Sequence, residues 1–287
     1  MRRVLAALCV LAVTVLVSGA LTAAVYARGI AFALGPWGTA AHVPAVALMA
    51  ALMAVALRKV RGLSREQTGL TLDARDAREG ALLLALTALT LIALVALAAA
   101  LTGSPLARSA NPLSLGALAL ALLSFVGSSA IQQLTTQSLV VTVSPAEGVS
   151  RVGIAVGVGL FTLAHVQVSA APLYLANVAL VGLVSTLFFV ARPRPSYAAP
   201  VGFHAAWNWA QVAVLGAPTP GESHNPLAVF RWPAGPSWLF GGANGLDEGA
   251  LFTAALVPFF GFALWWRAHH RFSRVSSRAH GEQARPA

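Results

Sequence analysis

Residues 81–101 read ALLLALTALTLIALVALAAAL, an apolar stretch that contains no charged side chain. A helix needs about 20 predominantly apolar residues to cross the hydrocarbon core of a bilayer, which is roughly 30 Å thick. This stretch has that length, so it predicts a transmembrane helix. With it, the sequence predicts eight membrane spans: Val4–Ala27, Ala40–Leu57, Ala81–Leu101, Leu113–Val143, Val152–Val168, Ala171–Val190, Ala198–Leu215 and Ala250–Trp266.

The composition of the chain of 287 residues agrees with this prediction. Hydrophobic residues make up 57% of the sequence and charged residues only 10%, whereas soluble domains carry about 25% charged residues. A soluble enzyme is therefore not expected, and intrinsic disorder is excluded because it requires low hydrophobicity. Cys9 is the only cysteine, which rules out an intrachain disulfide and a cysteine metal cluster. We expect an all-α, polytopic membrane helix bundle with about eight transmembrane helices.

The basic residues give the expected orientation in the membrane. The net charge is +10, but the basic residues lie in short clusters between apolar runs and form no extended basic face for nucleic acid. If the N-terminus is cytoplasmic, only Arg28, Arg108 and Arg231 of the 19 Lys and Arg residues fall in outer segments. This positive-inside distribution predicts that both termini are cytoplasmic. We expect a multi-pass protein of the cell membrane, with membrane lipids as partners and no nucleic acid.

Polar side chains are costly in hydrocarbon and often functional, and three of the predicted spans supply the candidate site residues. On the fourth span, polar residues recur at helical spacing and share one face: Ser129, Gln132, Gln133, Thr136 and Gln137. The fifth span contributes His165, and the seventh carries His204, Asn208 and Gln211 on one face. These groups are predicted to converge inside the bundle. The alternative is that each only makes interhelical hydrogen bonds that hold the helices together.

The fourth and fifth spans raise two packing expectations. The fourth span is long for a perpendicular crossing, since its residues would extend over roughly 46 Å. A steep tilt, or a break near residues 127–129, would bring its glutamines level with the histidines. On the fifth span, Gly153 and Gly157 have the small-xxx-small spacing that is typical of close helix packing.

The order and spacing of several motifs resemble the CPBP family of intramembrane proteases, which is named for CAAX prenyl proteases and bacteriocin-processing proteins. That family carries Glu-Glu-x-x-x-Arg on one helix, Phe-x-x-x-His on the next and His-x-x-x-Asn further on. Here Phe161 and His165 match the second motif, and His204 and Asn208 match the third. Residues 67–70 and the glycine-rich stretch 241–249 are similar to flanking segments of the family's core. The resemblance implies an N-terminal two-helix membrane segment (1–66), a protease-like core (67–266) and a basic cytoplasmic tail (267–287).

The resemblance implies an intramembrane endopeptidase that acts on a peptide or membrane-protein substrate. In the family, a glutamate and a histidine are thought to activate water, while the other histidine and the asparagine stabilise the oxyanion. This chain departs from the first motif, because amides replace its ionisable residues. The implied catalytic positions are Gln132, Gln133, Gln137, His165, His204 and Asn208. Since an amide cannot accept a proton at neutral pH, we expect a weakly active or inactive homologue.

Other interpretations stay open at this point. None of the nine acidic residues lies in a predicted span, and Asp247 and Glu248 are expected to cap the last helix. His165 and His204 offer two nitrogens to a divalent metal such as zinc, but a catalytic zinc site usually has three protein ligands, so the sequence leaves the cofactor unknown. His204 could itself act as the base in slow hydrolysis. A non-catalytic immunity or scaffold protein, or a small-solute transporter, would use the same polar cavity, although no inverted repeat is evident.

Overall fold

The computed structural model describes residues 1–25, 36–64, 66–70, 72–145, 148–166, 169, 171–192, 194–218, 228–242 and 245–283. Its long elements are the helices α1 (Arg2–Val25), α3 (Pro36–Val55), α4 (Ala74–Leu101), α5 (Leu115–Val143), α6 (Arg151–His165), α7 (Pro172–Phe189), α8 (Ala198–Trp209) and α10 (Ala250–Gln283). The short elements are the π-helical turns η2 (Ala56–Val60) and η3 (Ala210–Val214), the strands β1 (Ala107–Arg108) and β2 (Phe230–Arg231), the helix α9 (Ser237–Phe240) and the 3-10 turn η5 (Leu246–Glu248). Over the described residues the all-α prediction is confirmed.

Every predicted span overlaps one of the long helices. In the described part of the chain, five helical segments are long and apolar enough to cross a membrane: α3 with η2, α4, α5, α7 and the first part of α10. The predicted ends of the first and fifth spans, residues 26–27 and 167–168, lie outside the described residues. Helix α10 runs beyond its predicted end at Trp266 as far as Gln283, so most of the predicted tail is helical.

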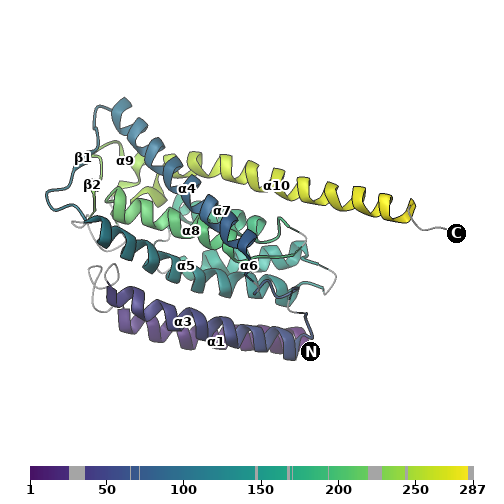
Figure 1. Ribbon diagram of the computed structural model, residues 1–287. Helices are drawn as coiled ribbons and strands as arrows, with labels where there is room; N and C mark the ends of the chain where they lie inside the picture. The colour runs from purple at the N-terminus through teal and green to yellow at the C-terminus, as the bar shows by residue number, and fades with distance from the viewer. Residues whose placement is uncertain are drawn as a thin grey trace.

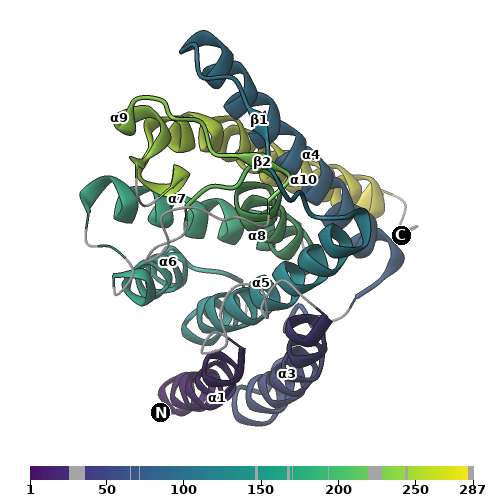
Figure 2. The ribbon, with the colours of Figure 1, turned by 90° about the vertical axis from the view of Figure 1, so that its left-hand side faces the viewer.

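Helix α8 lies at the centre of the bundle. It packs against α4, α5 and α7, and α6 fills the space between α5 and α7. The end-on view in Figure 2 shows α1 and α3 on the far side of α5 from α8, while α10 lies along α7. Helix α5 therefore separates the N-terminal pair of helices from the rest of the bundle, and one of its faces is turned to α8.

Polar side chains of the N-terminal helices contact α5. Thr14 of α1 and Thr135 of α5 lie with their hydroxyl oxygens 3.1 Å apart, and Thr39 Oγ1 of α3 donates to Leu120 O at 2.9 Å. His42 packs directly over Gly127, where an added Cβ would lie 2.4 Å from the His42 Cβ and 3.0 Å from its ring. Helix α5 is continuous through this contact and has no break at residues 127–129, which excludes that alternative.

Glycines bring two pairs of helices into backbone contact. On α8, a Cβ added to Gly202 would lie 2.1 Å from Gly80 O of α4, so the two helix backbones touch there. On α6, a Cβ added to Gly157 would lie 2.4 Å from a methyl group of Val140, and one at Gly153 would meet Ser144 Oγ at 2.2 Å. The predicted packing role of the Gly153–Gly157 pair is therefore confirmed, with α5 as the partner helix.

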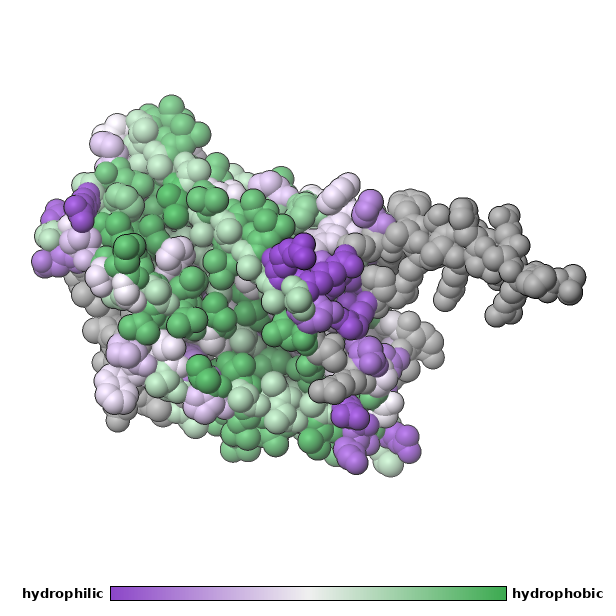
Figure 3. Space-filling model, viewed as in Figure 1, coloured by the Kyte–Doolittle hydropathy of each residue, from purple (hydrophilic) through white to green (hydrophobic). Residues whose placement is uncertain are grey.

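The two ends of the bundle differ from its middle. Figure 1 shows the N-terminus and the far end of α10 at one end, and the short antiparallel pair of β1 and β2 at the other. On the face drawn in Figure 3, hydrophobic residues form a broad belt and hydrophilic residues gather toward the two ends. This distribution is typical of a protein that sits in a bilayer with its ends in water.

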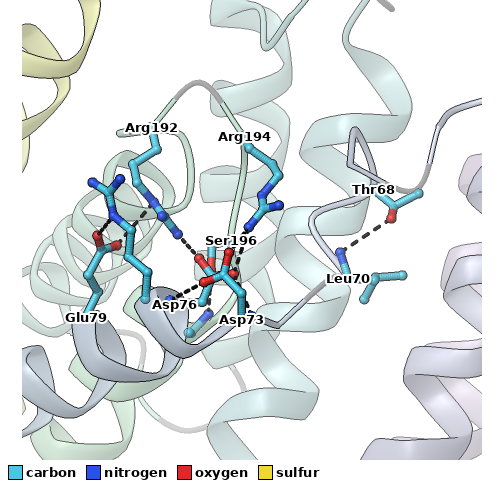
Figure 4. A network of polar contacts seen from close by, with 10 residues as sticks. Thr68, Leu70, Asp73, Asp76, Glu79, Arg192, Arg194 and Ser196 are labelled. Atoms are coloured by element: carbon cyan, nitrogen blue, oxygen red, sulfur yellow. Dashed lines mark hydrogen bonds and ion pairs between the residues drawn. The ribbon is translucent and has the colours of Figure 1, made fainter. Parts of the chain in front are cut away.

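A network of ion pairs fixes the start of α8 to the start of α4 (Figure 4). The linker between α7 and α8 carries Arg192 and Arg194, and the first turns of α4 carry Asp73, Asp76 and Glu79. Arg192 pairs with Asp76 and, at 3.1 Å, with Glu79, while Arg194 pairs with Asp73 and, at 3.4 Å, with Asp76. Asp73 and Asp76 also form a capping box at the N-terminus of α4. Because Asp76 is fully buried, these pairs hold α8 firmly against α4.

Candidate functional site

The polar face that the sequence predicts on α5 is turned into the bundle. Ser129, Gln133, Thr136 and Gln137 are all buried, and Gln132 is half-buried. A helix places residues at i, i+4 and i+8 on one side, and in this structure that side of α5 faces α7 and α8. The predicted ridge therefore lies where it can meet residues of the other helices.

Gln133 and Gln137 connect α5 to α8 and α7. Gln133 Nε2 lies 3.0 Å from His204 Nδ1, and Gln137 Nε2 donates to Gln133 Oε1 at 2.9 Å. Gln137 Nε2 also donates to Thr186 Oγ1 of α7 at 3.3 Å. Two predicted glutamines and one predicted histidine thus form one buried chain of hydrogen bonds, and this chain includes a threonine that the sequence did not single out.

Both histidines contact the aromatic ring of Phe161 of α6. The Phe161 ring centroid is 4.6 Å from that of His165 and 5.7 Å from that of His204. His165 Nδ1 lies 2.7 Å from Phe161 O, and since a carbonyl can only accept, His165 donates from Nδ1. Both histidines therefore contact one aromatic ring, but only His204 is hydrogen-bonded to a glutamine, whereas the hydrogen bond of His165 goes to the Phe161 carbonyl.

Two of the predicted site residues are less closely tied to this cluster. Asn208 lies one turn after His204 on α8 and is half-buried, but it makes no hydrogen bond to Gln133, Gln137, His165 or His204. The side-chain oxygen of Gln132 is buried and has no donor among the described residues. Of the two adjacent glutamines, Gln133 is the one that contacts His204, because neighbouring residues on a helix point about 100° apart.

A metal ion would find few ligands here. Within the described residues, no group of three or more His, Cys, Asp or Glu side chains is placed to hold one. His165 and His204 each already use Nδ1 in a hydrogen bond. A metal bound to these two histidines would therefore need their Nε2 atoms together with amide oxygens, which are weak ligands for zinc.

A second polar cluster lies beside η5, whose acidic residues the sequence predicts as caps of the last helix. Asn177 of α7 is fully buried; it donates to Asp247 O at 2.8 Å and accepts from Thr253 Oγ1 at 2.6 Å. The Asp247 carboxylate accepts a hydrogen bond from Gln211 of η3, a partner that the sequence did not predict. Burial raises the pKa of Asp247 to about 6, and the nearby Glu248 charge adds to the shift, while the Gln211 hydrogen bond opposes it.

The same cluster reaches the end of α6. Ser169, shortly after His165, donates from its hydroxyl to Glu248 at 2.5 Å. The η5 turn therefore connects the ends of α6, α7 and η3 on the side of the bundle where β1 and β2 lie (Figure 1). Residues 243–244, inside the predicted glycine-rich stretch, lie outside the described part of the chain. Of the residues in this second cluster that contact Asp247, the sequence analysis had singled out Gln211, because it shares a helix face with His204.

No family model, no curated protein and no solved structure matches this chain. The geometry of the buried hydrogen-bonded chain is therefore what a functional proposal has to be based on.

Proposed function

We propose that the protein is an intramembrane peptidase-like protein of the CPBP type whose acid–base site has become a neutral amide site. In this proposal it binds a peptide or a segment of a membrane protein and hydrolyses it weakly or not at all. The observation that carries the proposal is the 3.0 Å hydrogen bond between Gln133 and His204. It pairs the glutamine at the place of a family glutamate with the histidine of the third motif.

The chemistry of this pair explains the expected loss of activity. A glutamate at position 133 could take a proton from an attacking water, whereas the Gln133 amide cannot. Positioned acid–base catalysis contributes about 10²–10⁴-fold in rate, so its loss alone would leave hydrolysis slow. Gln137, at the place of the family arginine, removes the matching positive charge. A buried network with neither the negative nor the positive side chain avoids an uncompensated charge. Its amides can still form hydrogen bonds to an uncharged peptide group.

The proposal places the protein in the cell membrane, with eight spans and both termini in the cytoplasm. The support is that the predicted inner segments meet one another: Arg61 donates to Ser144 O at 2.8 Å, and the network of Figure 4 joins residues 73–79 to 192–194. At the other end, β1 pairs with β2. Membrane lipids would then surround the hydrophobic belt.

A cleavage assay with the purified protein in detergent and a peptide library tests the proposal. We expect little or no cleavage by the wild type, and a gain of about 10²–10⁴-fold in the double variant Gln133→Glu with Gln137→Arg. The matched control is Gln132→Glu with Gln137→Arg, which adds the same charges but leaves Gln133 against His204. It should gain nothing.

Two outcomes would count against the proposal. Rapid cleavage by the wild type that persists in His204→Ala would remove this site from catalysis. Absence of cleavage by every variant, together with peptide binding, would favour the alternative of a non-catalytic scaffold or immunity protein.

A further inference from the structure

Thr186, Gln137, Gln133 and His204 form the buried hydrogen-bonded chain, and Thr186 determines which group donates and which accepts at each of its bonds. Thr186 Oγ1 carries one proton and donates it to Gly182 O of the preceding turn of α7 at 2.8 Å. Toward Gln137 the hydroxyl can therefore only accept. Hence the group of Gln137 that lies 3.3 Å from Thr186 must be its amino nitrogen, Nε2.

This direction passes through both glutamines to the histidine. The second proton of Gln137 Nε2 goes to Gln133 Oε1 at 2.9 Å. With its oxygen turned to Gln137, Gln133 presents its amino nitrogen to His204 Nδ1 at 3.0 Å. An amide nitrogen only donates, so His204 Nδ1 accepts. In the neutral imidazole one nitrogen is protonated and the other is not, so the ring proton of His204 is on Nε2.

If donors and acceptors were reversed along the chain, fewer of its polar groups would have a hydrogen-bond partner. It would place the amino group of Gln137 where Gln137 Oε1 now lies, and that position is buried without a hydrogen-bond partner among the described residues. An amino group there would leave two protons without an acceptor instead of one oxygen without a donor. Thr186 would also have to release Gly182 O in order to donate to Gln137.

We propose that Thr186 is a positioning residue, which by accepting from Gln137 fixes His204 as the tautomer with the proton on Nε2. A carboxylate at position 133 would do the reverse, because it accepts from Nδ1 and leaves the Nε2 lone pair free to take a proton. In this chain His204 thus offers a donor. His165, whose Nδ1 donates to Phe161 O, offers an Nε2 acceptor in its neutral form.

One donor and one acceptor suit an uncharged amide group, which carries both a carbonyl and an N–H. They do not suit a carboxylate or an ammonium group, which would need two donors or two acceptors. This assignment of the ligand rests on the proposed function, whereas the tautomer follows from the hydrogen bonds of Thr186, Gln137 and Gln133 alone.

Nitrogen-15 NMR of the full-length protein in detergent, labelled at histidine, tests the tautomer directly, because protonated and unprotonated ring nitrogens resonate far apart. The His204 signals are assigned by their loss in His204→Asn. We expect an Nε2-protonated ring in the wild type and in Thr186→Ser, which keeps the hydroxyl. Thr186→Val should lose this single state, and Gln133→Glu should move the proton to Nδ1.

The matched control is Thr142→Val. Thr142 is also fully buried and donates to the carbonyl four residues before it. Its hydroxyl is bonded to Ser138 O and to no residue of the hydrogen-bonded chain, so His204 should keep its wild-type signals. A wild-type His204 protonated on Nδ1, an unchanged spectrum in Thr186→Val, or an equal change in Thr142→Val would each overturn the proposal. Rapid cleavage by a wild type that keeps the Nε2 proton would refute the proposed function instead.

Discussion

The contact between α4 and α8 at Gly202 leads to a prediction that connects packing with the site. A Cβ at this position would lie 2.1 Å from Gly80 O, whereas ordinary contacts begin at 3.4 Å. Gly202→Ala therefore forces the two helices apart by roughly 1 Å. Gly202 precedes His204 by two residues, so a shift of this size would displace His204 by more than its 3.0 Å bond to Gln133 tolerates.

The cost can be worked out from these two effects. Overpacking a well-packed contact costs about 1–3 kcal/mol, and leaving the buried Gln133 and His204 groups unpaired adds about 1–3 kcal/mol. The better helix propensity of alanine returns about 0.5–1 kcal/mol. We expect Gly202→Ala to lower the free energy of unfolding by about 1–5 kcal/mol.

Equilibrium unfolding of the detergent-solubilised protein, followed by tryptophan fluorescence, measures this change. The matched control is Gly159→Ala on α6, where an added Cβ meets nothing within 4 Å and only the gain in helix propensity applies. If Gly202→Ala is as stable as Gly159→Ala, then α4 and α8 are not in backbone contact and the reasoning is refuted.

Two further predictions concern charged residues outside the spans and use the same unfolding measurement. Arg192→Met should destabilise the protein by about 3–5 kcal/mol, because it removes a partner of the fully buried Asp76. Arg194→Met, at a side chain that is 37% exposed, should cost about 1 kcal/mol or less. Equal losses of stability in the two variants would contradict this account. Burial raises the pKa of Asp247 to about 6 in the folded state, whereas an unfolded chain has an aspartate pKa of about 3.9. Between these values the folded state keeps a proton that the unfolded state has released. The free energy of unfolding should therefore fall as the pH rises from about 4 to about 6. Asp247→Asn should abolish this decline, and an unchanged pH profile would show that the carboxyl is not buried in solution.

The sequence was informative about the helices because their apolar runs and polar faces repeat with the helical period. It placed Gln133, Gln137 and His204 on faces that the structure turns toward one another, and it identified the Gly153–Gly157 pair as a packing surface. It could not decide between Gln132 and Gln133, since the rotation of α5 about its own axis depends on what packs around it. It also gave no sign of Thr186, a single threonine in an apolar run.

The long-range contacts had to come from the tertiary structure. The charges at residues 73–79 and 192–194 are separated by more than a hundred residues, and a charge pattern does not say which opposite charges will meet. Asp247 illustrates the same point: its position before α10 suggested a cap, and only the folded structure shows that its carboxylate accepts a hydrogen bond from Gln211.

By itself, the sequence determined that the chain forms apolar helices and which side of each helix is polar, because secondary structure and amphipathicity depend on neighbours three and four residues away. Only the tertiary structure decided that Gln133 meets His204 and that Thr186 gives their hydrogen bonds a direction. The physical reason is that a hydrogen bond needs its two atoms within about 3 Å, and that precision across three helices depends on how every side chain between them packs.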